Sequence, residues 1–236
     1  MRRSVRAVLM LAAGVLLGGC GGGGPTAPAG PSPTASTLAP AGLRSPTPAP
    51  TPPSRSPSRR PSVDPLSPDG LLAAADASGR RPQTHAEPVQ DGRFRARVGA
   101  LWSAVVTGRP QPALALFFPL PAYRQVKALA DPAADWRDRL VRLYDLDLGT
   151  LHATVPRGSR LLGATVPAGA ATWVRPGEES NRLGYWRVYG TRVAYRTPAG
   201  AEASFGVCSL IGWRGEWYAV HLGPVDHPAG VGALCP

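Results

Sequence analysis

The fold is decided by residues 185–222, which read YWRVYGTRVAYR (185–196), TPAGAE (197–202), ASFGVCSLIGW (203–213), RG (214–215) and EWYAVHL (216–222). In the first, third and fifth of these blocks, apolar and polar residues alternate with the period of two that a half-buried strand requires. Residues 197–200 form the first connecting turn, and in the second, Arg214-Gly215, the glycine supplies the positive φ of a two-residue hairpin turn. The stretch therefore predicts three antiparallel strands in succession.

Two shorter strands are expected just before this stretch, at 161–166 and 171–174, with Pro167, Ala168 and Gly169 between them. Further towards the N-terminus the period becomes helical, and cap residues mark the ends of helices. Asp91 and Gly108 bound the first helix, and Asp131 followed by Pro132 begins the longest. Helices are expected over 91–107, 112–118, 121–129 and 131–148.

Helices followed by hairpin-connected strands, without alternation of the two, indicate an α+β domain. We expect N-terminal helices packed on a curved antiparallel sheet over residues 91–236. Residues 20–90 are rich in Pro, Ser, Thr and Ala, and the first aromatic residue of the chain is Phe94. Such a segment buries too little apolar surface to offset the entropy of ordering. It is expected to be a disordered linker, with at most a transient helical turn near Leu71.

Residues 1–19 have the layout of a signal peptide, with Arg2, Arg3 and Arg6 before an apolar run from 7 to 17. Their end, Leu17-Gly18-Gly19-Cys20, resembles the lipobox of bacterial lipoproteins. The resemblance implies that Cys20 receives lipid, palmitate included, and becomes the first residue of the mature chain. The protein would then be extracytoplasmic, anchored to the outer face of the cell membrane. An ordinary signal peptide with an incidental cysteine is the alternative.

The remaining cysteines, Cys208 and Cys235, form an even pair in an oxidising compartment. We expect a disulfide between them, which would hold the C-terminal tail across the sheet. Two buried free thiols are the alternative.

Four segments of the domain carry a second resemblance: Leu101–Val106, Ala122–Lys127, Gly184–Tyr189 and Trp213–Tyr218. Through them the domain resembles the nuclear transport factor two-like, or cystatin-like cone, superfamily, and more closely lipoproteins of high-GC Gram-positive bacteria. The superfamily implies a cone whose pocket lies between helices and sheet and serves catalysis, binding or dimerisation. The closer group implies no activity.

The most unusual polar stretch runs from Arg175 to Arg187. It combines carboxylates, an amide and guanidiniums with aromatic rings, a mixture that suits a sugar or a peptide. The possible ligand-binding residues are Glu178, Glu179, Asn181, Tyr185, Trp186 and Arg187. An Arg–Glu paired loop packed on the sheet edge is the alternative.

Catalytic motifs are absent from the sequence, and no catalytic residue is assigned. Asp145, Asp147, Glu178 or Glu179 would be the base of a pocket enzyme, with Tyr185, Tyr189 and Tyr195 as donors. The favoured interpretation of the aspartates is solvated helix surface, of the glutamates loop surface, and of the tyrosines core edges.

No metal or cofactor is expected, because neither His152 nor His221 has a second ligand at metal spacing. The net charge is +11, but from Asp91 onward seventeen Lys and Arg stand against eleven Asp and Glu, so nucleic acid is not an expected partner. The sequence favours a non-enzymatic binding module whose partners are the membrane, through the Cys20 lipid, and an envelope polymer or membrane protein. A pocket enzyme of isomerase, cyclase or hydratase type and a docking partner of a membrane protein, with a dimer possible, are the alternatives.

Overall fold

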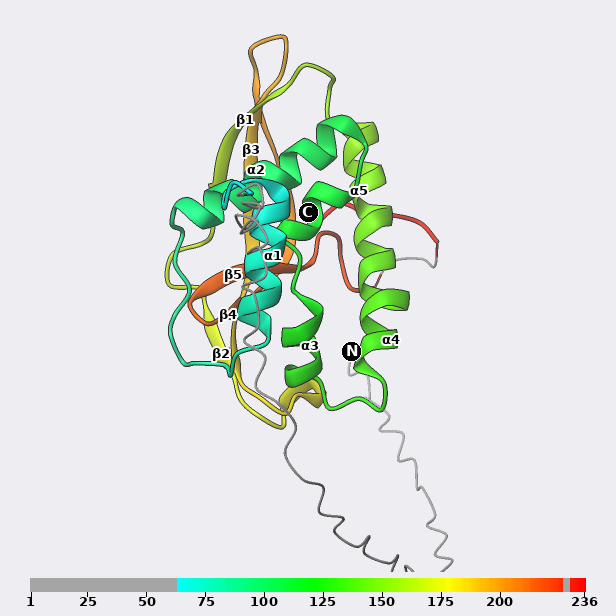
Figure 1. Ribbon diagram of the computed structural model, residues 1–236. Helices are drawn as coiled ribbons and strands as arrows, with labels where there is room; N and C mark the ends of the chain where they lie inside the picture. The colour runs from blue at the N-terminus through cyan, green and yellow to red at the C-terminus, as the bar shows by residue number, and fades with distance from the viewer. Residues whose placement is uncertain (1–62, 227–229) are drawn as a thin grey trace, which may run out of the picture. The chain divides into compact units, whose positions relative to one another are not determined.

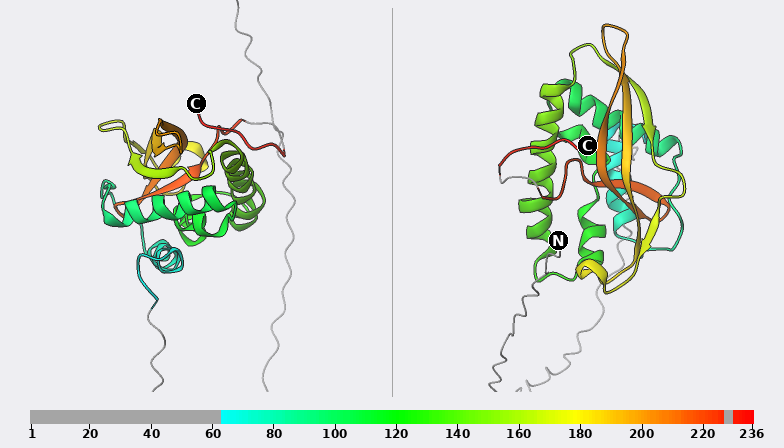
Figure 2. Two further views of the ribbon diagram at one scale, coloured as in Figure 1. Left: turned by 90° about the horizontal axis from the view of Figure 1, so that it is seen from above. Right: turned by 180° about the vertical axis from the view of Figure 1, so that it is seen from behind.

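The computed structural model describes residues 63–226 and 230–236. The expected signal peptide, the expected lipobox with Cys20 and most of the expected linker lie outside these residues. The described part is an α+β fold in which helices cover one side of an antiparallel sheet (Figures 1 and 2), as the sequence predicts. No described helix combines the length and the apolar character needed to cross a membrane.

The helical elements are α1 (Pro68–Gly79), α2 (Gly92–Thr107), η1 (Gln111–Ala115), α3 (Leu120–Val126), α4 (Pro132–Asp135), η2 (Trp136–Val141) and α5 (Arg142–Thr154). The caps of α2 are those that the sequence predicts. The Asp91 side chain accepts a hydrogen bond from the Phe94 amide at 2.9 Å, and Gly108 ends the helix in the left-handed region. The expected long helix is present as α4, η2 and α5 in succession, with a π-helical segment at 136–141.

The packed fold begins before residue 91, so the expected extent of the linker is wrong. Ser67 caps α1 by accepting a hydrogen bond from the Gly70 amide, and Pro68 occupies the first turn. Leu71 and Ala75 are fully buried, and Leu71 clusters with residues of α2 and η1. This helix has only two large apolar residues, Leu71 and Leu72, and it is ordered because the neighbouring helices cover it, which its own sequence does not show.

The sheet contains β1 (Arg160–Thr165), β2 (Thr172–Val174), β3 (Tyr185–Arg196), β4 (Glu202–Trp213) and β5 (Glu216–His221). The order is β1-β3-β4-β5, with every neighbouring pair antiparallel, so the predicted succession of the three long strands is confirmed. The two short strands do not pair with each other. Instead β1 pairs with 192–196 and β2 with 185–187, and together they follow one edge of β3.

The C-terminal tail is held at two points. Cys208 and Cys235 have Cα atoms 5.3 Å apart and sulfurs within bonding distance, the pairing that the cysteine count predicts. On α5, the Asp147 carboxylate accepts hydrogen bonds from the amides of Gly223 and Ala233, each at 2.8 Å. These contacts fix the tail beside α5 and place Val225 at the edge of the cavity described next.

Candidate functional site

A cavity of about 320 Å³ opens between α3, η2 and strands β3 to β5. Its apolar lining is Phe118, Val126, Leu140, Leu210, Ile211, Val220 and Val225. Its polar lining is Tyr123, Lys127, Arg139, Glu179, Tyr185, Arg187, Tyr189, Ser209 and His221. A concave lining that combines apolar side chains with placed polar groups is typical of a small-molecule site.

Glu179 is the centre of the first polar group in the cavity. Its carboxylate accepts a hydrogen bond from the Tyr185 hydroxyl at 2.8 Å and forms an ion pair with Arg187. Arg187 also lies over the Tyr189 ring, 4.9 Å from its centre. Burial alone would raise the pKa of Glu179, but the hydrogen bonds from Tyr185 and Arg187 outweigh it and hold that pKa below its usual value. The carboxylate is therefore ionised at neutral pH.

The backbone of Glu179 is strained. Glu179 and Ser180 have φ of 50° and 57°, in the left-handed region that costs a residue other than glycine about 1 kcal/mol or more. Backbone contacts with the end of α3 hold this conformation, since the Ser180 carbonyl accepts from the Ala128 amide at 2.8 Å. In this conformation the Glu179 carboxylate lies at the cavity wall, on a loop hydrogen-bonded to the residues that follow α3.

Asp135 anchors the second polar group. It accepts hydrogen bonds from Arg139 Nε and Nη2, both at 2.7 Å, and from the Tyr123 hydroxyl. The hydrogen bond from Arg139 is the main reason that the pKa of Asp135 lies below its usual value. Burial and the hydrogen bond to Asp135 raise the pKa of Tyr123 well above that of a free tyrosine. Arg139 and Tyr123 therefore face the cavity in fixed protonation states.

Lys127, directly after α3, differs from both arginines. Its ammonium donates to the Glu179 backbone carbonyl at 3.1 Å, and no carboxylate of the described residues forms an ion pair with it. Burial is the main cause that lowers its pKa from the ordinary lysine value, with Arg139 adding to the effect while Glu179 and Asp135 oppose it. Lys127 is thus a partly buried cation that forms no ion pair with a carboxylate of the described residues, although the charges of Glu179 and Asp135 act on it.

The structure brings together only half of the predicted ligand-binding residues. Glu179, Tyr185 and Arg187 line the cavity, and the buried Asn181 supports them by donating to the Tyr185 hydroxyl at 3.0 Å.

Glu178 and Trp186 lie elsewhere. Glu178 accepts from the Arg175 amide within its own loop. Trp186 packs with Trp173 and His85, at ring distances of 5.6 and 5.4 Å. Because successive residues of a strand point to opposite faces, Trp186 is excluded from the face that Tyr185 and Arg187 share.

The two aspartates considered as bases have separate surroundings, and neither lines the cavity. Asp147 is only 2 % exposed and holds the tail, so its interpretation as solvated helix surface is wrong. Asp145 lies in a separate depression of about 80 Å³ with His152, where partial burial raises its pKa. The sequence of the tail gave no indication that its amides would donate hydrogen bonds to a carboxylate on α5.

The three tyrosines considered as donors also separate. Tyr185 lines the cavity, Tyr189 is 57 % exposed at its edge, and Tyr195 packs on Trp102 and Phe205 in the core. Among the described residues, no group of three or more His, Cys, Asp or Glu side chains is placed to hold a metal ion.

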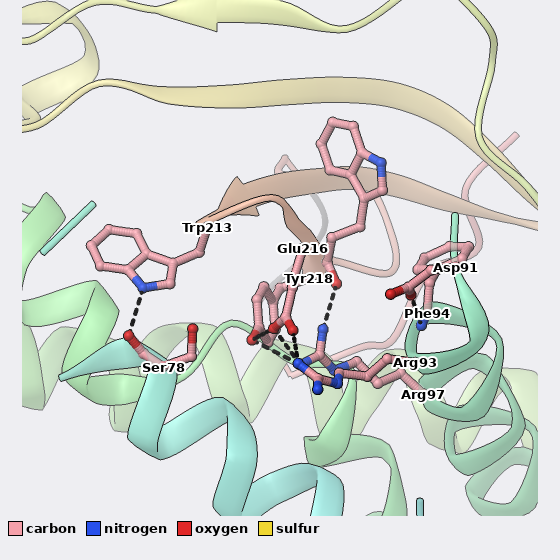
Figure 3. A network of polar contacts seen from close by, with 9 residues as sticks. Ser78, Asp91, Arg93, Phe94, Arg97, Trp213, Glu216 and Tyr218 are labelled. Carbon is pink, nitrogen blue, oxygen red and sulfur yellow. Dashed lines mark hydrogen bonds and ion pairs between the residues drawn. The ribbon is translucent and has the colours of Figure 1, made fainter. Parts of the chain in front are cut away.

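A second polar cluster, the Arg97 cluster, joins α2 to β5 (Figure 3) and consists of Arg93, Arg97, Glu216 and Tyr218. Arg97 is 1 % exposed and donates to Glu216 Oε2 and the Tyr218 hydroxyl, both at 2.8 Å. Its guanidinium also lies 4.1 Å from the centre of the Tyr218 ring. Arg93 supplies a second cation to Glu216 at the surface, and Arg97 Nε is the one nitrogen of the buried guanidinium without a hydrogen-bond partner among the described residues.

Three cavity residues escaped sequence reasoning: Lys127, Arg139 and Tyr123. Lys127 is the only lysine of the chain, and Asp135 and Arg139 have the i, i+4 spacing of a helical ion pair. These signals mark surface pairs as often as sites, and only the packing of α3 and η2 against the sheet joins them to Glu179. Comparison of the chain with protein-family models, with curated proteins and with solved structures gave no match.

Proposed function

We propose that the protein is an extracytoplasmic lipoprotein, anchored to the cell membrane through lipid on Cys20, whose domain binds a small ligand in the cavity between α3, η2 and the sheet. Anchoring is supported by the basic opening, apolar run and Leu17-Gly18-Gly19-Cys20 sequence. The cystatin-like cone assignment remains part of this proposal, supported by helices on one side of a curled sheet with a cavity between them.

One observation carries the binding function: an apolar cavity whose polar groups are held in charged or hydrogen-bonded states. A desolvated carboxylate with a raised pKa facing the ligand would favour a pocket enzyme of the isomerase, cyclase or hydratase type. The carboxylate that lines this cavity, Glu179, has a lowered pKa instead. An interior packed solid would have favoured a docking partner, whereas a cavity of about 320 Å³ is within the range of ligand sites.

Ligand binding is tested by filling the cavity. Val220→Trp introduces a large ring at the lining. We expect it to lower the affinity for Nile red, an uncharged apolar dye, at least tenfold, as measured by the rise in dye fluorescence on binding. Val106→Trp on the exposed part of α2 is the matched control and should leave dye binding unchanged. Equal binding by both variants, with near-UV circular dichroism intact, would place the dye elsewhere and reject the cavity as the site.

Anchoring is tested by metabolic labelling with an alkyne analogue of palmitate. The wild-type chain should be labelled and sediment with membranes, whereas Cys20→Ala should carry no label. Cys208→Ala is the control and should keep the label. Label on the Cys20→Ala chain would show that the lipid acceptor is another residue.

A further inference from the structure

Three cations from three separate elements meet in the cavity. Lys127 follows α3, Arg139 lies on η2 and Arg187 lies on β3. Only one carboxylate, Glu179, is in the lining with them, and Asp135 lies behind Arg139. The cavity wall therefore carries more positive than negative charge.

The two arginines are neutralised from within the protein. Arg139 is held by both oxygens of Asp135, and Arg187 by Glu179 and the Tyr189 ring. Among the described residues, the Lys127 ammonium donates to one backbone carbonyl, that of Glu179, which leaves ammonium hydrogens available to a ligand. The charges of Glu179 and Asp135 act on Lys127 without forming an ion pair with it, so an anion in the cavity would be its first directly paired charge in this part of the chain.

The lining also has an apolar part on both sides of the cavity, with Val126 and Leu140 from the helices and Leu210, Ile211 and Val220 from the sheet. A water molecule takes about 30 Å³ in the liquid, so the cavity has room for roughly ten groups of that size. This space suits one short apolar chain and not a bilayer lipid with two long ones.

We propose that the cavity takes an anionic amphiphile, a single apolar chain of about ten atoms that ends in a carboxylate or phosphate, with Lys127 pairing with the acidic group. This inference rests on the proposed function, in which the cavity is a ligand site. Arg139 and Arg187 are paired with Asp135 and Glu179, so Lys127 supplies the main attraction for the acidic group. A cationic head would be repelled by Lys127, and a neutral chain would leave Lys127 without an ion pair.

The experiment compares probes with one chain length and different heads. Decanoate, decanol and decyltrimethylammonium are titrated into residues 20–236 with Cys20→Ser. Because this chain carries no lipid, it needs no detergent, which would compete with the probes for the cavity. Displacement of Nile red reports the affinity. We expect decanoate to bind at least tenfold more tightly than decanol, and decyltrimethylammonium to bind most weakly.

Lys127→Gln should reduce decanoate affinity about tenfold and leave decanol affinity unchanged. Arg124→Gln is the matched control, because Arg124 is an exposed cation on α3 that does not line the cavity. A second readout uses the wild-type chain. Lys127 is the only lysine, so its acetylation by an amine-reactive ester can be followed by peptide mapping, and decanoate should protect it more than decanol does.

The outcomes separate the two proposals. If none of the probes, Nile red included, binds, the proposed function itself fails. If decanoate and decanol bind equally, or if decanoate leaves Lys127 acetylation unchanged, the cavity remains a ligand site and the inference about its ligand is overturned. Decyl phosphate in place of decanoate tells which acidic group binds more tightly.

Discussion

The Arg97 cluster and the cavity contain the same chemical groups in two different roles, internal stabilisation and a lining open to a ligand. Each combines arginines, a glutamate and a tyrosine. In the Arg97 cluster the buried guanidinium has its carboxylate, its hydroxyl and its ring within contact distance, and only its Nε has no hydrogen-bond partner among the described residues. In the cavity the charges are spread over three elements around open space, and Lys127 forms no ion pair with a carboxylate of the described residues. Open space beside the charged groups, and not the residue types, separates this candidate binding site from a structural cluster.

Arg97→Met should give the largest effect. It removes the buried cation from Glu216 and the Tyr218 hydroxyl, and we expect the free energy of unfolding to fall by about 3 kcal/mol, as for other buried pairs broken on one side. Urea unfolding of the mature chain measures the change. Arg93→Met removes a half-exposed partner of the same Glu216 and should cost less than about 1 kcal/mol. Equal losses for the two variants would show that burial does not distinguish them.

Replacing Cys208 and Cys235 together by alanine should affect the cavity more than the Arg97 cluster. The bond closes a loop with a sequence separation of 27, and chain entropy puts its contribution at about 3 kcal/mol. Because the tail places Val225 at the cavity, decanoate affinity should fall as well. The Tyr218 amide should keep its protection from hydrogen exchange under native conditions. An unchanged urea midpoint after the double replacement, or after reduction of the wild-type chain, contradicts this expectation.

The two glutamates provide a matched pair. Glu216→Gln should cost about 2 kcal/mol, because the buried Arg97 loses its charged acceptor. Glu179 is 47 % exposed at its side chain, and Glu179→Gln should cost less than about 1 kcal/mol. The second variant should also bind decanoate more tightly, since the cavity loses its negative charge. A larger stability loss for Glu179→Gln than for Glu216→Gln would contradict the assignment of Glu216 to the stabilising cluster and of Glu179 to the binding site.

Acidification should give the smallest effect. Burial raises the pKa of Glu216, but Arg97, Tyr218 and Arg93 outweigh it and hold that pKa below the ordinary 4.5. A carboxylate with a lowered pKa in the folded state contributes stability that is present above pH 4.5 and is lost as the pH falls through the folded pKa. Stability should therefore be flat near neutrality and decline below pH 4.5. Thermal unfolding from pH 3 to 7 should show a shallower decline for Glu216→Gln, and an unchanged slope would exclude Glu216 as a cause.

The sequence by itself determined the fold class, the succession of the long strands and the caps of α2. These depend on the period of apolar residues, on Gly215 and on Asp91, all of which act over a few neighbouring positions. The same local logic failed at α1, where Leu71 and Ala75 are ordered by contacts with other helices. It also failed at Asp147, whose hydrogen-bond partners lie 76 and 86 residues away.

Only the tertiary structure decided which polar residues share a site. The strand period predicts that Trp186 and Tyr185 point to opposite faces of the sheet. Which of the two faces lines the cavity is decided by the packing of α3 and η2. Lys127, Arg139 and Glu179 are far apart in the chain, and their proximity depends on how the helices cover the sheet. Lys127 is a partly buried cation without an ion-pair partner in the described residues, and its surroundings come from three separate elements. A local sequence pattern cannot predict this, because the fold decides which groups lie near a charge.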